Sequence, residues 1–158
     1  MVAWPDYSIL KLIHILSATL LFGTGLGTFF FMVMAVRAGN VEALRVTSRT
    51  VVIADFVFTT PAVIVQFLTG LGLMHALGIP LASAWFGMVL SLFVFVGCLW
   101  LPVVAIQIRL RNLLADLPPG ADLPEEFRCR VRVWERMGYP AGVAMIGLFV
   151  MMVFKPFL

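Results

Sequence analysis

The sequence predicts an all-α integral membrane protein, a bundle of four helices that cross the bilayer. Its 158 residues are 62% hydrophobic and only 12% charged, whereas soluble domains are about 45–50% apolar and about 25% charged. Several apolar runs reach the roughly 20 residues that a membrane-spanning helix needs. Such helices can bury side chains only against one another, so we expect a single domain.

Glycines and prolines delimit the four predicted spans. We expect spans at about residues 8–37, 50–77, 82–108 and 138–157, joined after the third by a cytoplasmic segment, 109–137. Pro61 and Pro102 should bend the second and third spans, and Pro140 should mark the entry of the fourth.

Within the cytoplasmic segment, residues 127–134 alternate apolar and basic side chains, which would suit a strand. A lone strand at a membrane surface has no pairing partner, however. Phe127, Val131 and Trp134 also recur at helical spacing. We therefore expect an amphipathic helix that lies at the lipid headgroups.

The distribution of Lys and Arg predicts the orientation. Nine of the eleven cationic residues fall in the first and third connections, and only Lys11 and Lys155 fall on the other side. Because cytoplasmic loops carry the excess of positive charge, both termini should face outward from a bacterial inner membrane. The first apolar run is too long for a signal-peptide core and lacks an A-x-A cleavage site, so it should be retained.

Other features exclude some functions. The net charge of +3 follows from this topology, and no nucleic-acid signature is present. Cys98 lies in a span and Cys129 in the cytoplasmic segment, so we expect both to be packing residues rather than partners in a disulfide. Trp4, Trp85 and Trp134 are expected as interfacial anchors.

His14 is the strongest candidate functional residue. It lies about 10 Å along the first helix, at 1.5 Å per residue, within the apolar layer. Lys11 lies one turn before it on nearly the same face, and Gly23, Gly25 and Gly27 follow on the same helix. These glycines would let a second backbone or a flat cofactor approach closely. The alternative is a packing helix whose histidine bonds to a neighbouring carbonyl.

A polar stripe runs along the second helix. Asp55, Thr59, Gln66 and Thr69 recur at spacings of four and three, together with Ala62 and Leu73. The stripe should face the bundle, since lipid would leave its groups unpaired. For Asp55 we expect an ion pair or hydrogen bond with Arg109, Arg111 or Gln107. The alternative is a proton relay along Thr59 and Gln66.

His75 and several methionines are further ligand candidates. His75 shares a leaflet with His14, which would suit a bis-histidine haem or a copper site, but it falls nearly opposite the polar stripe on a straight helix. Thioether and imidazole together suit Cu(I). The methionines in this half are also typical gap-fillers in apolar packing: Met74, Met88, Met151 and Met152.

Four segments resemble a family of bacterial integral membrane proteins called domain of unknown function 2269. They are Leu10–Ile15, Leu21–Gly27, Phe58–Ala62 and Trp100–Arg109. The resemblance covers essentially the whole chain and implies a four-helix fold, but no activity.

Lys11, His14 and Ile15, as Lys-x-x-His-Ile opening the first helix, also resemble the HemJ-type protoporphyrinogen oxidases and, more distantly, CopD-like copper-resistance membrane proteins. In the HemJ type the matching histidine is implicated in binding haem b, with quinone-linked oxidation of the porphyrinogen. The resemblance implies that His14 is an axial ligand and that Lys11 neighbours a carboxylate. The third span here lacks the HemJ-type lysine, so haem binding is implied rather than porphyrinogen oxidation.

Two functions therefore remain open. The first is a haem-binding redox protein centred on His14, linked to a quinone or a membrane redox partner. The second is a non-enzymatic membrane subunit or copper-handling protein whose polar groups serve helix packing. Membrane lipid is the expected surrounding in both cases, and the sequence is compatible with a homo-oligomer.

Overall fold

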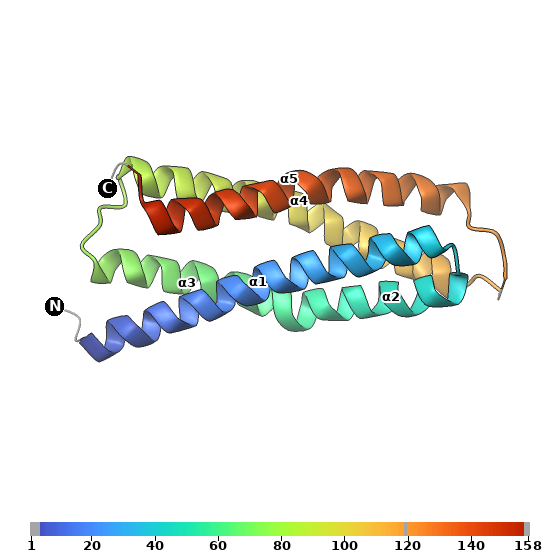
Figure 1. The fold of residues 1–158 in the computed structure, drawn as a ribbon, viewed down its shortest axis with the longest axis horizontal. Coiled ribbons are helices and arrows are strands. Elements are labelled where there is room, and N and C mark those ends of the chain that lie inside the picture. Colours follow the sequence, from blue (N-terminus) through green and yellow to red (C-terminus); the bar gives the residue numbers. More distant parts are fainter. Residues whose placement is uncertain (1–3, 119, 157–158) are drawn as a thin grey trace.

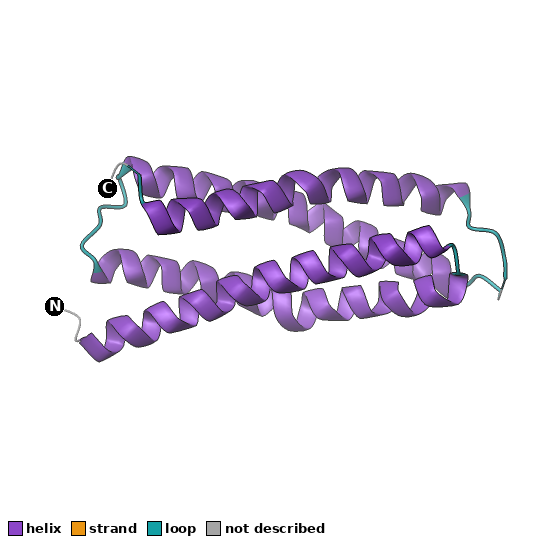
Figure 2. Ribbon diagram, viewed as in Figure 1, coloured by secondary structure: helices purple, strands orange, loops and turns teal. Residues whose placement is uncertain are grey.

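The computed structural model describes residues 4–118 and 120–156, and its regular elements in that part are all helical (Figure 2). These elements are α1 Trp4–Ala38, α2 Val41–Ala54, the π-helical turn η1 Asp55–Thr59, α3 Thr60–Ala76, α4 Ala84–Ala115 and α5 Glu125–Phe154. Because α2, η1 and α3 run on without a break, the described chain forms four rods, each long and apolar enough to cross a membrane. The predicted fold class is confirmed.

The bundle has two chemically different ends. α1 begins and α5 finishes at one of them, here called the termini end, where the α3–α4 connection also lies (Figure 1). The α1–α2 and α4–α5 connections lie at the other, the arginine end. Lys11 and Lys155 belong to the termini end, and all nine arginines to the half at the arginine end. The predicted segregation of charge is therefore present along the bundle.

The second rod is longer than the sequence suggested, because it begins at Val41 rather than near residue 50. Gly39 has a φ of +65°, which reverses the chain after α1. Asn40 then caps α2, since its side-chain oxygen accepts a hydrogen bond from the Ala43 amide at 3.0 Å. α2 therefore starts directly after a tight turn and carries Arg45 and Arg49 on its first turns.

The fourth rod also begins earlier than expected. α5 starts at Glu125 and passes through Pro140 without a break, so this proline lies inside the helix rather than at its entry. Residues 127–134 are helical, as predicted, but they are part of the long helix α5 rather than a separate surface helix. Phe127, Val131 and Trp134 instead face the other helices and are buried.

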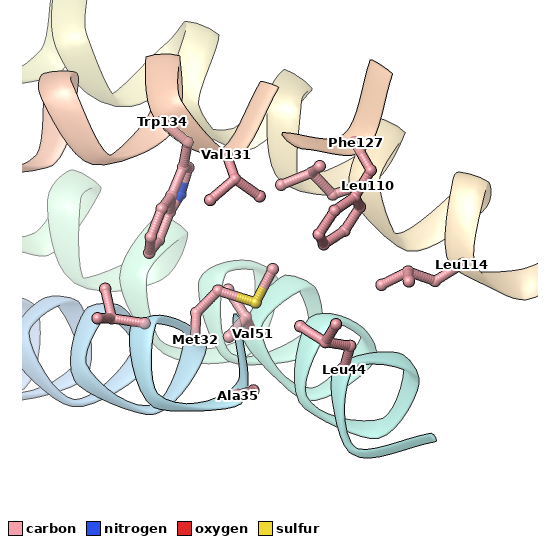
Figure 3. Packing of buried hydrophobic residues seen from close by; sticks show 10 residues of the cluster. Met32, Ala35, Leu44, Val51, Leu110, Leu114, Phe127, Val131 and Trp134 are labelled. Atoms are coloured by element: carbon pink, nitrogen blue, oxygen red, sulfur yellow. The ribbon is translucent and has the colours of Figure 1, made fainter. Parts of the chain in front are cut away.

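The largest apolar core lies at the arginine end, where α1, α2, α4 and α5 all contribute side chains (Figure 3). Met32 of α1, Leu44 of α2 and Leu110 of α4 are almost completely buried there, as is Phe127 of α5. Trp134 is only 2% exposed and belongs to this core. The prediction of an interfacial anchor at Trp134 is therefore wrong.

A smaller cluster joins α3, α4 and α5 at the termini end. Trp85 packs there with Met74 and Val89, and its Nε1 donates a hydrogen bond to the Met151 carbonyl oxygen at 2.8 Å. Trp85 is thus a buried link between α4 and α5 rather than an interfacial anchor. The side chain of Trp4, the third predicted anchor, lies outside the described residues.

The helices pack as two closely associated pairs. α1 packs mainly along α3, and α4 packs mainly along α5, while α2 contacts both α1 and α4. The four rods are therefore tied together at the arginine end. Toward the termini end the pairs α1–α3 and α4–α5 diverge (Figure 1), and the cluster around Met74 and Trp85 links α3 to α4 and α5.

Candidate functional site

His14 is held by side chains of α3 through both of its ring nitrogens. Its Nδ1 lies 2.9 Å from Thr69 Oγ1, and its Nε2 lies 2.9 Å from Gln66 Nε2. Ser17, one turn further along α1, donates its hydroxyl hydrogen to Gln66 Oε1. The histidine of the first helix and the polar stripe of the second therefore form one network.

The neighbours of His14 define its tautomer. The Thr69 hydroxyl donates to the Val65 carbonyl oxygen at 2.6 Å, so toward His14 the Thr69 oxygen acts as an acceptor. Nδ1 must then carry the ring hydrogen, and Nε2 accepts from the Gln66 amide. This assignment follows from the network, and it leaves a neutral imidazole. In metal-binding histidines one ring nitrogen is likewise held by an acceptor while the other ligates.

The same network borders a cavity of about 450 Å³ between the two helix pairs. His14 and Gln66 line one side of it, and its walls are largely apolar, with Phe67, Phe93 and Phe149 among them. Cofactor and small-molecule sites typically measure about 300–1,000 Å³ and combine apolar walls with a few polar groups. Both the size and the lining suit a largely apolar ligand.

Two lysines border this cavity, and they are the only lysines in the sequence. Lys11 lies one turn before His14 on α1, and its Nζ lies 5.9 Å from the centre of the Tyr7 ring. Lys155 directly follows α5. Both belong to the termini end, so the cavity has an imidazole on its wall and two cations toward one end.

The glycines that bring helices close to His14 are not the predicted ones. A Cβ added at Gly23, Gly25 or Gly27 would meet no atom within 4 Å, so no other helix packs tightly on these positions. At Gly70, by contrast, an added Cβ would lie 3.4 Å from His14 Cε1. The sequence could have indicated this contact, because Gly70 directly follows Thr69 of the polar stripe.

His75, the second predicted ligand, lies on an exposed part of α3 and does not line the cavity. Its neighbour Met74 does line the cavity, as do Met145 and Met152 of α5. The soft side chains that the fold brings to the same cavity as His14 are thus methionines. Met145 was not among the predicted candidates.

Asp55 occupies a second polar site, in η1. The predicted ion pair is wrong, because Arg109 Nε instead donates to Glu126 Oε1 at 3.1 Å, and Arg111 donates to the side chain of Asn112. Gln107 does lie beside the Asp55 carboxyl group, as predicted. Asp55 is 4% exposed and forms no salt bridge within the described residues.

The described residues contain no group of three His, Cys, Asp or Glu side chains arranged to hold a metal ion. Cys98 and Cys129 are both free and exposed. A metal at His14 would therefore need thioether ligands or a macrocycle to complete its coordination.

The fold and these two polar sites define a four-helix integral membrane protein with an apolar cavity beside a partly buried histidine. The chain belongs to the DUF2269 family of predicted integral membrane proteins, whose model matches residues 8–156. No curated protein and no solved structure matches the chain.

Proposed function

We propose that this protein is a haem-binding redox protein of the bacterial inner membrane, with b-type haem in the cavity beside His14. The observation that carries the proposal is the composition of this one cavity. It combines a neutral imidazole, largely apolar walls and both lysines of the chain. An apolar macrocycle with two propionates has matching chemistry.

Each lining residue has a role in this proposal. His14 Nε2 would hold the iron after Gln66 releases it, while Thr69 keeps Nδ1 protonated and the ring oriented. Lys11 and Lys155 would face the propionates. Met74 or Met152 would supply a second ligand more readily than His75, which lies outside the cavity. A haem bound there supplies one-electron transfer, with a quinone or a membrane redox protein as electron partner.

We also propose the orientation that the charges favour, with the arginine end in the cytoplasm and both termini outside. The cavity would then lie in the outer leaflet. Every residue that the proposal uses comes from one chain, so the proposal holds equally for a monomer and for a homo-oligomer.

A second candidate is a membrane subunit in which these polar groups serve only helix packing. The observation in its favour is that both ring nitrogens of His14 already have partners within the protein. If this subunit handles copper, the metal would bind to His14 and the cavity methionines, since thioether and imidazole form a soft ligand set. Bound copper without haem would support this copper-handling function.

The test is a dithionite-reduced minus oxidised spectrum of purified protein, expressed with ample haem supply, together with metal analysis. We expect a b-type α-band in the wild type, loss of the band in His14→Ala, and retention in His75→Ala as the matched control. Absence of the band in the wild type, where a control cytochrome loads fully, would overturn the haem proposal.

Gln66→Leu separates the two candidates further. If Gln66 merely competes with iron for His14 Nε2, the variant keeps the band. If the network serves packing alone, Gln66→Leu leaves the partly buried His14 Nε2 without its hydrogen-bond partner, which should cost about 1–3 kcal/mol of stability. A destabilised variant without a band, from a wild type also without one, would favour the packing role.

A further inference from the structure

Three polar side chains surround the buried Asp55 carboxyl group, between η1 and α4. Thr59, Trp100 and Gln107 all lie beside the Asp55 carboxyl group. Asp55, Thr59 and Gln107 are each more than nine-tenths buried. Within the described residues, one polar atom of each of the four side chains lacks a hydrogen-bond partner: Asp55 Oδ2, Thr59 Oγ1, Trp100 Nε1 and Gln107 Oε1.

This cluster lies deep in the bundle. Asp55 is fourteen residues beyond Val41 and twenty-one before Ala76 in one continuous rod, so it lies at least about 20 Å from either end of that rod at 1.5 Å per residue. The rod is π-helical there, and Pro61, which has no amide hydrogen, follows. π-Helical turns within α-helices often occur at functional sites.

The elements packed around η1 offer no cation to Asp55. On α1, the residues between His14 and Arg37 include no titratable side chain, and His14 is bonded to Gln66 and Thr69. On α2, Arg45 pairs with Glu42, and Arg49 is exposed.

The remaining neighbours give the same result. On α3 the only titratable group is His75, which is exposed and near the opposite end of that helix. On α4, Cys98 is exposed, Arg109 pairs with Glu126, and Arg111 binds Asn112. An isolated ionised carboxylate at this depth would be costly.

We infer that Asp55 is an intramembrane proton-binding site, with Thr59, Trp100 and Gln107 as the groups that receive each of its forms. When a proton from the aqueous phase forms an O–H bond on Asp55 Oδ2, the neutral acid can donate to Gln107 Oε1. When that proton returns to water, the carboxylate can accept from Trp100 Nε1–H and the Thr59 hydroxyl. Both forms therefore find partners in the same place.

A metal cation fits the cluster less well, because the indole N–H of Trp100 is a donor and cannot act as a ligand. This inference is independent of haem binding at His14. It concerns another site, on different residues.

Infrared difference spectroscopy of the full chain in lipid nanodiscs, titrated with pH, tests the inference. We expect a carboxylic-acid C=O band that disappears as the pH rises and is missing in Asp55→Asn. The control is Asp116→Asn, which removes an exposed aspartate at the end of α4 and should leave the band unchanged.

A second variant covers the case in which Asp55→Asn does not fold. The chain has four aspartates, so Asp6→Asn, Asp116→Asn and Asp122→Asn together leave Asp55 as the only one. Carboxyl-¹³C-labelled aspartate must then shift the band. If no labelled acid band appears at any pH, the inference is overturned. It is equally overturned if NaCl, but not choline chloride, stabilises the wild type through an ionised Asp55.

Discussion

At the scale of single residues, Phe29 shows how closely the arginine end is packed. Its ring stacks on Trp134 with centroids 4.9 Å apart and planes 21° apart. It also meets the Tyr139 ring edge-on, with centroids 5.4 Å apart. Gly138 lies against the same ring, because a Cβ added there would overlap Phe29. The contact between α1 and α5 therefore depends on the missing side chain at position 138.

We predict that Gly138→Ala destabilises the protein by about 1–3 kcal/mol, the usual cost of overpacking a filled core. Phe29 cannot move away easily, because Trp134 and Tyr139 both contact it. The matched control is Gly142→Ala, one turn later on α5, where an added Cβ meets nothing within 4 Å. Thermal unfolding in detergent should show a lower midpoint for Gly138→Ala alone. Equal midpoints for both variants would contradict the prediction.

The sequence was sufficient to predict which polar side chains face the interior of the bundle. The stripe through Asp55, Gln66 and Thr69 faces the bundle, as its spacing indicated. The hydrogen-bond and ion-pair partners of these side chains were harder to predict, because they depend on how far one helix is shifted along another. That shift places Gln66 against His14, and it places Arg109 against Glu126 rather than Asp55.

At the scale of elements, the C-terminus of α4 is capped by a side chain of another helix. Arg45 of α2 donates from Nε to the Leu114 carbonyl oxygen at 3.1 Å, and from a terminal nitrogen to the Leu117 carbonyl oxygen. Glu42 accepts from the same guanidinium at 2.7 Å. A cation suits this position, because the final carbonyl groups of a helix lack amide partners and carry partial negative charge.

We predict that Arg45→Gln lowers stability by about 1–2 kcal/mol, since it removes two charge-assisted hydrogen bonds at a partly exposed site. Arg49→Gln, one turn later, is the control. Arg49 is exposed, no polar partner of it is found within residues 4–118 and 120–156, and its loss should change stability by less than about 0.5 kcal/mol. Thermal unfolding of both variants checks this, and an unchanged midpoint for Arg45→Gln would refute the capping role.

Two helices begin earlier in the structure than the sequence indicated. The second span was expected to start near residue 50. Yet Asn40 caps a helix that already contains Arg45 and Arg49. Likewise, Phe127 and Trp134 indicated a helix, but whether it would lie on the membrane or join the bundle depended on α1, α2 and α4 receiving its apolar face.

At the scale of the whole molecule, the bundle has its largest apolar core at one end and a cavity in the half toward the other end. The arginine end holds the largest apolar core, while the cavity beside His14 separates the helix pairs in the half toward the termini end. Exposed apolar side chains such as Leu16, Phe31 and Leu101 cover the outside, as expected for a lipid-facing surface. The number of rods was readable from hydropathy. Their pairing was not, because most of the surface of every span is apolar and only α1 and the α2–η1–α3 rod carry polar groups that bond to each other.

The whole-molecule prediction is that the arginine end faces the cytoplasm. All nine arginines lie in that half of the bundle, and only two lysines lie toward the other end. In a background with Cys98→Ser and Cys129→Ser, a single cysteine at Asp6 should react with a membrane-impermeant maleimide in intact cells. A single cysteine at Asp122, exposed in the α4–α5 connection, should react only after lysis. The reverse pattern would contradict the positive-inside argument and would place the His14 cavity in the inner leaflet.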